Sequence, residues 1–585
     1  MAQILFDQVR DFTGGLNFRA DQFQLANNES PFILNMDVDP RGGVFARAGY
    51  RKKHTTQVSG NWNPKGLFNY KDASSPRIIL NTGYEVVNSV PTDGKIYQST
   101  GGNFSTIQYS SGNDVAIKSA NGAGVTQWLD TIYIAVGKDG SQMYKWNQND
   151  TYATALLASG PTWQPYQNPV GGYMPRAEHV RAHANKLFVA NTKELNDDAT
   201  PTLVDHPNRI RWSHENRPED WYQDDYIDIV AGGEGIRGLA IVDGQLLIFK
   251  PKAVYLLMGY DVDSFQLVEL STTVGIQYPQ HVVEGSGGAY FFDYPAGLLF
   301  YNRNGIQDLF SRLKPVIDTN RLNANRLTDL TLSYVNDRLW MSAPFDIRNT
   351  GTAVDYSNMN FIFDPSIGRS GAFTMYQSAS YANAATPSPI LPYGLLSGCD
   401  WTDDDGEIWH LMIHPNDNFK YVMYIDEFEY SDNVAQNQTD DILEGNELGD
   451  YTTNYTTSWF YDDRYVQDKT FVRSLYVVRP VDENTQIVVN VYHDFNNEDV
   501  ITSHTIDLMP VVTGGVWGTA IFGTSVFGES DLREGIQRGG RLKRAKATQL
   551  EFVGPTALTT GTTGRQWGLN SIAYKFKRRK VRSQK

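Results

Sequence analysis

Two pairs of histidines have the spacing of a metal site: His179 with His183, and His410 with His414. On a helix, residues four apart lie close enough to share an ion. The surroundings of these pairs favour strands, and four residues of a strand span about 13 Å, which is too far for one Zn²⁺. Neither pair has the glutamate of the metalloprotease helix motif. We therefore expect both pairs to be structural, and we predict no metal site and no cofactor.

The segment 402–409, Thr-Asp-Asp-Asp-Gly-Glu-Ile-Trp, resembles the Asp-box of sialidase-type propellers through Thr402, Asp404, Gly406 and Trp409. In those families the box is a hairpin turn. The hydroxyl and the carboxylate bond turn amides, the glycine takes a positive φ, and the tryptophan packs on the sheet. The segment lacks the alternating oxygen ligands and the terminal glutamate of a strong Ca²⁺ loop. It therefore indicates a turn within a β-propeller.

Sequence signatures of catalysis are missing. No Gly-x-Ser-x-Gly elbow, Walker-type loop or Rossmann glycine pattern occurs. The 66 acidic residues allow a pair of catalytic carboxylates, but no local signature selects one. We therefore predict no catalytic residues and a non-enzymatic function. A glycan-recognising module stays open because loops rich in Tyr and Trp suit sugar stacking, and a propeller polysaccharide hydrolase stays open as well.

The end of the chain is strongly basic, with seven Lys or Arg among residues 575–585. The whole chain is acidic, with a formal net charge of −15, which argues against a protein that coats DNA. The basic segment predicts contact with an acidic neighbouring copy or with nucleic acid, or else a strand end that charge keeps soluble; an acidic neighbour is favoured over nucleic acid. The candidate contact residues are Lys577, Arg578, Arg579 and Lys580.

Composition points to β structure without cross-links. Among 585 residues there is one cysteine, Cys399, which excludes an intramolecular disulfide framework and a thiolate zinc cluster. The start of the chain has no basic segment followed by an apolar stretch, and no apolar run approaches 20 residues, so we predict neither a secretory signal nor membrane insertion. Aromatic residues make up 12% of the chain and there are 51 glycines, which favours strands over helices.

One pattern repeats along most of the chain: a short β-branched or aromatic run, a turn of Gly, Asn or Asp, and another run. Asp243-Gly244 between two apolar runs is an example of such a hairpin signal. The hairpins recur roughly every 40–50 residues, which is the period expected of four-stranded propeller blades. An array of β-sandwiches would give a similar alternation of short strands and turns.

We therefore predict an all-β chain that combines a β-propeller with an extended N-terminal arm and a C-terminal β-sandwich-like domain. The arm covers residues 1–50 and the propeller covers 51–430. An acidic linker or loop covers 431–455, and a C-terminal β domain with a basic tail covers 456–585. In the last strand of that domain, we expect Ile572, Tyr574 and Phe576 to share one face.

The first fifty residues resemble the opening of bacteriophage tail proteins. The segments that carry the resemblance are Phe12-Thr-Gly-Gly-Leu-Asn-Phe-Arg-Ala, Leu25-Ala-Asn-Asn-Glu-Ser-Pro, Leu34-Asn-Met-Asp-Val-Asp, Gly42-Gly43 and Arg47-Ala-Gly-Tyr50. The family comprises the tail nozzle (tubular protein B-type) proteins of short-tailed phages and minor tail proteins of some long-tailed phages. The aromatic and glycine-rich run 514–528 is similar to runs in phage virion proteins.

The resemblance implies a structural protein of the virion, assembled in the host cytoplasm and built into the tail near its host-facing end. Its implied partners are other copies of itself in a ring (a hexamer or a trimer) and neighbouring tail proteins. DNA would pass transiently, and a host surface glycan or receptor is a further candidate partner. The family offers no catalytic residues to carry over.

Within the arm, the residues expected to form an assembly interface are Phe12, Gly14, Gly15, Leu16, Asn17 and Phe18. The two glycines permit a tight bend of the backbone, and Leu16 and Phe18 are suited to anchor in a groove. The alternative for the same residues is an intramolecular clasp that closes the propeller.

Overall fold

The fold is known from a computed structural model. It describes residues 4–21, 24–60, 62–72, 75–87, 89–140, 142–156, 175–195, 202–231, 234–347, 351, 354–368, 370–378, 381–382, 389–390, 393–415, 420–426, 432–433, 448–449, 452–461, 469–478, 485–508, 535–538, 544–554 and 567–578.

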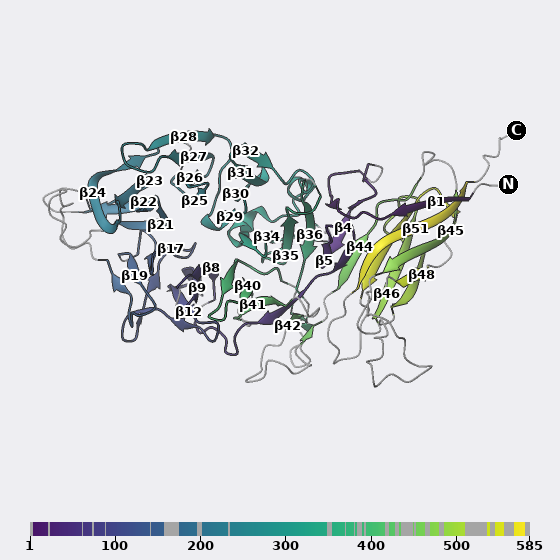
Figure 1. Ribbon diagram of the computed structural model, residues 1–585, viewed down its shortest axis with the longest axis horizontal. Helices are drawn as coiled ribbons and strands as arrows, with labels where there is room; N and C mark the ends of the chain where they lie inside the picture. Colours follow the sequence, from purple (N-terminus) through teal and green to yellow (C-terminus); the bar gives the residue numbers. More distant parts are fainter. Residues whose placement is uncertain are drawn as a thin grey trace.

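Most of the described chain forms seven small antiparallel sheets, which follow one another around a common centre (Figure 1). In chain order these sheets contain β8 (Pro64–Tyr70), β9 (Arg77–Thr82), β12 (Gly94–Ser99) and β13 (Ser105–Thr106); β17 (Gly124–Trp128), β18 (Thr131–Ala135), β19 (Tyr144–Trp146) and β20 (Thr154–Ala155); β21 (Arg176–His183), β22 (Lys186–Leu195), β23 (Leu203–His214) and β24 (Arg217–Asp228); β25 (Gly238–Val242), β26 (Gln245–Lys250), β27 (Ala253–Met258) and β28 (Gln266–Ser271); β29 (Val282–Gly285), β30 (Gly288–Asp293), β31 (Gly297–Asn302) and β32 (Gly305–Asp308); β33 (Thr331–Val335), β34 (Arg338–Ala343), β35 (Met359–Asp364) and β36 (Ala372–Tyr376); and β39 (Gly398–Thr402), β40 (Ile408–Ile413), β41 (Val422–Asp426) and β7 (Gly49–Lys52). The predicted β-propeller is confirmed.

The hairpins inside these sheets arise from the turn residues that the sequence displays. Asp243 and Gly244, between β25 and β26, have φ of 50° and 71°. Asn336 and Asp337, between β33 and β34, have φ of 53° and 54°. Consecutive positive φ values are what a two-residue hairpin turn requires, because they match the twist of the flanking strands. The repeated turn signal therefore produces the repeated sheet.

The first and the last of these sheets contact each other. Strand β39 contacts β8, and the Asn69 side-chain amide donates to the Asp400 carbonyl over 2.8 Å. The outer strand of the last sheet, β7, comes from the N-terminal segment and pairs antiparallel with β41. Two ends of the propeller sequence thus meet in one sheet.

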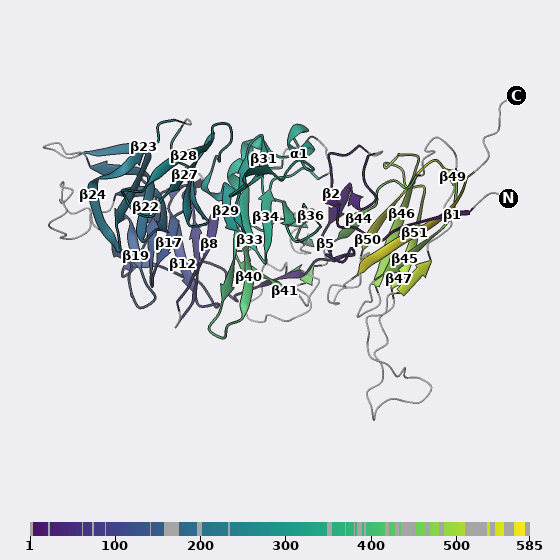
Figure 2. The ribbon, with the colours of Figure 1, turned by 45° about the horizontal axis from the view of Figure 1, so that its top comes forward.

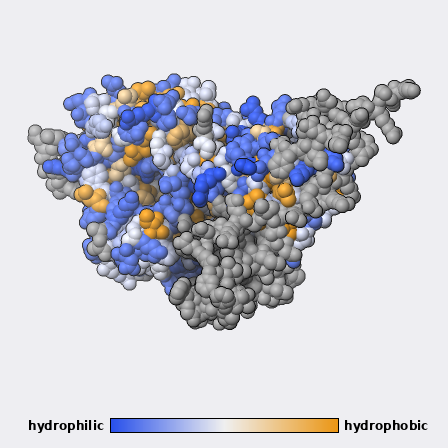
Figure 3. Space-filling model, turned by 45° about the vertical axis from the view of Figure 1, so that its right-hand side comes forward, coloured by the Kyte–Doolittle hydropathy of each residue, from blue (hydrophilic) through white to orange (hydrophobic). Residues whose placement is uncertain are grey.

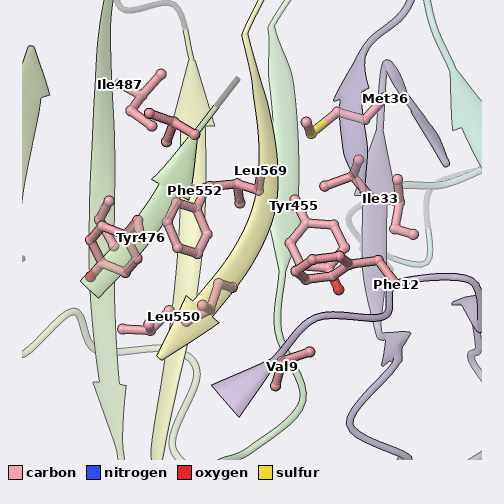
Figure 4. Close-up of a cluster of buried hydrophobic side chains, with 14 of the residues drawn as sticks. Val9, Phe12, Ile33, Met36, Tyr455, Tyr476, Ile487, Leu550, Phe552 and Leu569 are labelled. Atoms are coloured by element: carbon pink, nitrogen blue, oxygen red, sulfur yellow. The ribbon is translucent and has the colours of Figure 1, made fainter. Parts of the chain in front are cut away.

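The C-terminal domain is a sandwich of two sheets with an apolar core between them (Figures 2 and 4). One sheet runs β48-β45-β51-β6-β5, with β1 beside β51 and β49 beside β45; the other runs β4-β44-β50-β46-β47. The strands are β1 (Ile4–Val9), β4 (Phe32–Leu34), β5 (Met36–Val38), β6 (Val44–Ala46), β44 (Thr453–Thr456), β45 (Lys469–Val478), β46 (Thr485–His493), β47 (Thr502–Leu508), β48 (Gly535–Arg538), β49 (Arg544–Ala545), β50 (Thr548–Gly554) and β51 (Gly568–Arg578). Ile572, Tyr574 and Phe576 are all buried, as expected for one face of the last strand.

The N-terminal segment is extended, but it runs through both domains and does not stand apart from them. Strands β1, β5 and β6 belong to one sandwich sheet and β4 to the other. Strand β4 pairs on one side with β44 and on the other, in parallel, with β36 of the propeller. One sheet is therefore continuous from the sixth propeller sheet, through β4, into the sandwich.

The predicted linker over 431–455 ends earlier than expected, because β44 begins at Thr453 and both Thr453 and Tyr455 are buried. Its residues 434–447 lie outside the described part. The remaining elements are β2 (Gly15–Leu16), β3 (Glu29–Ser30), β10 (Glu85–Val87), β11 (Val90–Thr92), β14 (Gln108–Ser110), β15 (Asn113–Asp114), β16 (Ala116–Ile117), β37 (Tyr381–Ala382), β38 (Pro389–Ile390), β42 (Asp432–Asn433), β43 (Leu448–Gly449), α1 (Pro315–Asp318) and the 3₁₀ helices Pro279–His281 and Ala324–Asp329. Among the described residues, no helix has the length and apolar character needed to cross a membrane.

Candidate functional site

Asn35 lies where the propeller, the sandwich and the N-terminal segment meet. Its backbone amide donates to the Met375 carbonyl (2.7 Å), and its side-chain carbonyl accepts from the Gln377 amide (2.8 Å), both in or just after β36. Its side-chain NH₂ donates to the Thr452 carbonyl (2.9 Å), just before β44. Asn35 has a φ of 54°, a conformation that asparagine tolerates better than most residues. One side chain therefore bonds both domains.

Arg47 completes this junction from inside the protein. It is fully buried, and its Nε donates to the Asn35 side-chain carbonyl over 2.9 Å. Its two terminal nitrogens donate to the carbonyls of Ala48 (2.7 Å) and Gln377 (3.0 Å). The guanidinium lies 4.0 Å from the ring centre of Tyr50. Several hydrogen bonds and an aromatic face thus compensate the burial of the charge. We call Asn35 and Arg47 the junction pair.

Asp37 of β5 forms a second polar link to the propeller. Its carboxylate accepts from Arg338 (2.8 Å) and from the Tyr376 hydroxyl. Arg338 also pairs with Asp364 over 3.1 Å. The Asp37 carboxylate raises the pKa of Arg338, and burial together with that same carboxylate raises the pKa of Tyr376. The cluster therefore holds a charged arginine and a protonated tyrosine at neutral pH, which suits a structural link.

The arm residues predicted to form an assembly interface are used inside the chain. Phe12 is buried in the sandwich core, where its ring packs edge-on against Tyr455 at 5.3 Å. Leu16 is fully buried in the propeller, in the cluster that contains Phe373. Residues only four apart thus enter the cores of two domains. This placement is intramolecular, as in the alternative prediction, but it joins the propeller to the sandwich and does not close the propeller. We call this link the clasp, and a contact of the segment with another copy stays a prediction.

The predicted tight bend at the two glycines is present. Gly15 has a φ of 66°, and a Cβ there would lie 2.9 Å from the Ala372 side chain. A Cβ on Gly14 would lie 2.6 Å from the Asn28 carbonyl oxygen. Asn17 caps the next turn, its side-chain oxygen accepting from the Arg19 amide at 2.9 Å. Only glycine fits this approach of the segment to the propeller.

Beside this segment, a groove of about 580 Å³ lies between the sheets β29–β32 and β33–β36. Tyr290, Phe300 and Gln307 are register partners across β30, β31 and β32, so their side chains form one row. Phe363 and Phe373 are register partners on the opposite sheet. The Tyr290 ring lies 4.6 Å from that of Phe300 and 6.4 Å from that of Phe363. The inner part of the groove is therefore aromatic, and Gln307 lies toward its polar mouth.

Arg312 connects the groove to the arm. Its side chain donates to the Gly14 carbonyl (2.8 Å), and its carbonyl accepts from the Phe18 amide (3.0 Å). A second side-chain nitrogen donates to the Ser370 hydroxyl over 3.4 Å. The Phe18 ring packs against Phe345 at 6.3 Å. The groove wall is thus held in place by the same segment that joins the domains.

The Asp-box turn is present, but its carboxylate is Asp403 and not Asp404 as predicted. Asp403 accepts from the amides of Asp405 (3.0 Å) and Glu407 (2.9 Å), and from the Trp409 indole N–H (2.8 Å). The indole bond is the main cause that lowers the pKa of Asp403. Because strand β39 ends at residue 402, position 403 is the first turn residue and faces the turn amides. The predicted positive φ of Gly406 is confirmed, at 82°.

Both histidine pairs lie on or next to strands, as predicted. His179 and His183 are in β21, and His410 is in β40, where it bonds Asp400 over 2.7 Å. His414 follows β40 and is buried, and burial lowers its pKa to about 3. Among the described residues, no group of three or more His, Cys, Asp or Glu side chains is placed to hold a metal ion.

The predicted basic contact residues are only partly described. Lys577 lies in β51, is exposed, and pairs in register with Ile4. Arg578 ends that strand, and Arg579 and Lys580 lie outside the described residues.

Figure 3 shows hydrophilic residues over most of the described surface on one face, with small hydrophobic patches among them.

Sequence reasoning missed the junction pair and the groove. Asn35 and Arg47 stand in the segments that carry the phage-tail resemblance, so the signal was present, but their roles depend on partners more than 300 residues away. The groove is built from register partners on two sheets, and a spacing rule within one strand does not predict it.

No protein-family model matches the chain, and no curated protein matches it. Among solved structures, it is similar to BBS1N in complex with ARL6DN, with 9% identity and a TM-score of 0.34 over 65% of this chain and 97% of that one. It is also similar to a glycoside hydrolase family 43 arabinoxylan arabinofuranohydrolase from Bacillus subtilis, with 11% identity and a TM-score of 0.23 over 89% of this chain and 97% of that one. At these TM-scores neither similarity indicates a function.

Proposed function

We propose that this chain is a non-enzymatic structural component of a bacteriophage tail, which forms an oligomeric ring near the host-facing end. One observation carries the proposal. The segments that resemble phage tail proteins supply the clasp: Phe12 and Leu16 enter two cores, and Asn35 and Arg47 form the junction pair. If this chain and the phage tail proteins join their domains in the same way, the residues that make this link are the ones expected to be similar.

The clasp also suits a part that must transmit force. The sheet that continues from β36 through β4 to β44 joins the domains by backbone hydrogen bonds as well as by side chains. A subunit built in this way can hold neighbours on both domains without the domains separating. Lys577 and the rest of the basic end are the proposed contact with an acidic neighbouring copy.

The proposal is tested in purified particles of a phage that encodes the chain. We expect mass spectrometry to detect the chain in the particles and cryo-electron microscopy to place it in a ring near the tail tip. In a phage carrying Arg47→Leu, we expect the chain to be missing from the particles and infectivity to be lost. Gln266→Ala, at an exposed position on β28, is the control and should assemble normally. Infectious particles that lack the chain would contradict the proposal.

A further inference from the structure

The groove between the fifth and sixth propeller sheets has an apolar inner wall and a polar mouth. Tyr290, Phe363 and Phe373 form its buried part, and the half-buried Phe300 continues the aromatic row outward to the exposed Gln307. A sugar ring is amphipathic in the same way: the C–H groups of one face can pack on aromatic rings, and the hydroxyls at its edge can hydrogen-bond polar groups. The volume of about 580 Å³ is in the usual range of small-ligand sites. We propose that this groove binds a neutral sugar residue of a glycan.

Free hydrogen-bonding atoms along the groove favour a polyhydroxylated ligand over an apolar one. The Tyr290 hydroxyl, the Gln307 amide and the Ser311 hydroxyl bond no other residue in the described part of the chain. The Tyr290 side chain is almost fully buried, and burial raises its pKa to about 12, so its hydroxyl stays protonated and able to donate. An apolar side chain of a peptide would leave these groups without partners, which is unfavourable.

The charges at the groove indicate a neutral ligand that is bound and not cleaved. Asp308 is the only carboxylate among the described lining residues, and one of its oxygens accepts from the Phe310 amide over 2.7 Å. Arg312 is the only cation there, and its side chain already bonds Gly14 and lies 3.7 Å from Glu29. The two charges balance. Glycoside hydrolysis uses two carboxylates, so a single one supports recognition without hydrolysis.

The inference does not depend on a place in a phage tail, because binding is measured on the isolated full chain. The probe is an array of neutral oligosaccharides built from glucose, galactose, mannose and rhamnose. The member that binds most tightly is then titrated calorimetrically against the wild type and three variants, each checked for an unchanged circular dichroism spectrum.

The first variant, Gln307→Ala, removes one hydrogen-bonding group from the mouth, and we expect about five- to tenfold weaker binding. The second variant, Gly287→Asn, places a side chain at the groove where a Cβ meets no atom within 4 Å. Asparagine accepts the φ of 77° found there, and we expect at least about tenfold weaker binding because the side chain occupies the site. The matched control is Gln266→Ala, another exposed glutamine on the outer strand of the preceding sheet, which should bind like the wild type.

Three results would overturn the inference. They are binding of no oligosaccharide on the array, equal binding by wild type, Gln307→Ala and Gly287→Asn, and weaker binding by Gln266→Ala to the same extent as by the two groove variants. Loss of glycan binding in both groove variants but not in Gln266→Ala would establish the site, wherever the chain is located in a particle.

Discussion

The propeller and the sandwich are both built from antiparallel strands, but they assemble their cores from different parts of the chain. In the propeller, the four strands of each of the first six sheets come from one stretch of the chain, and the seventh sheet is completed by a distant strand, β7. In the sandwich, β1, β4, β5 and β6 come from the N-terminal segment and the remaining strands from beyond residue 452. The propeller is thus a sum of local hairpins, whereas the sandwich requires both ends of the chain.

This difference makes the N-terminal segment the structural link between the two domains. Local hairpins close with little loss of chain entropy, but pairing of β1 with β51 closes a loop of more than 500 residues. The sandwich therefore forms only when strands far apart in the sequence pair. The junction pair and Phe12 are where we expect substitutions to separate the behaviour of the two domains.

Replacing Arg47 with leucine should have the largest effect. Arg47 donates to Asn35, Ala48 and Gln377. The Asn35 oxygen keeps the Gln377 amide as a donor, but the two carbonyls lose theirs, and each buried acceptor left without a donor costs about 1–3 kcal/mol, so we expect a loss of roughly 4 kcal/mol. In calorimetry, the sandwich should unfold separately and before the propeller. Arg303→Leu, at an exposed arginine, should change stability by less than about 0.5 kcal/mol. A single, unshifted transition in Arg47→Leu would show that the junction does not couple the domains.

Two phenylalanine truncations sharpen the comparison between the domains. Phe12→Ala in the sandwich and Phe249→Ala in the propeller each empty a fully buried site and should cost about 3–5 kcal/mol. Hydrogen exchange should show faster exchange in β50 and β51 for Phe12→Ala, but only in sheets β25–β28 and β29–β32 for Phe249→Ala. Equal exchange across the whole molecule in both variants would mean that the two cores unfold together.

The local part of the fold could be predicted from the sequence, and the long-range part could not. Turn dipeptides such as Asp243-Gly244 act through their own φ values, so they indicate hairpins before any tertiary contact is known. The N-terminal strands are only a few residues long, as in Met36–Val38, and show no periodicity. Their place in the sandwich is set by distant partners.

The same limit applies to the candidate sites. The bend at Gly14 and Gly15 could be predicted because glycine adopts positive φ values without a steric penalty, whatever its distant neighbours are. The groove could not, since Tyr290 and Phe363 become neighbours only when two sheets pack. The Asp-box residue was assigned one position too late, because resemblance in spacing does not fix where strand β39 ends and the turn begins.

Acidic pH should destabilise the last propeller sheet, because His54 is held in its neutral form where the N-terminal segment meets β41. The His54 Nδ1 donates to the Thr56 carbonyl (2.8 Å), and its Nε2 accepts from the amide of Val422 in β41 (2.9 Å), so the ring is bound in its neutral form. Burial, and secondarily the charge of Lys52, lowers its pKa to about 4 from the ordinary 6.5. Between those values the unfolded chain binds a proton that the folded chain does not. Stability therefore falls as the pH falls from about 6.5 to about 4, by about 3 kcal/mol for this group.

The check is urea unfolding of the wild type and His54→Gln between pH 7 and pH 4. Glutamine keeps a donor and an acceptor but does not titrate, so the variant should lose less stability over this range. His281 and His414, whose pKa values burial lowers to about 4 and about 3, stay in both proteins and give the remaining slope. Parallel pH profiles for the two proteins would show that protonation of His54 does not cause the loss of stability.

The smallest expected effect separates two neighbouring aspartates in the turn of the last propeller sheet. Asp403 accepts from two amides and from the Trp409 indole, whereas Asp404 is exposed and bonds no other described residue. Asp403→Ala should therefore lower the free energy of unfolding by about 1 kcal/mol, and Asp404→Ala should leave it within about 0.5 kcal/mol of the wild type. Because the turn joins β39 to β40, the loss should appear in the propeller transition and not in that of the sandwich. A larger loss for Asp404→Ala would restore the assignment made from spacing alone and would place the turn one residue later than the structure does.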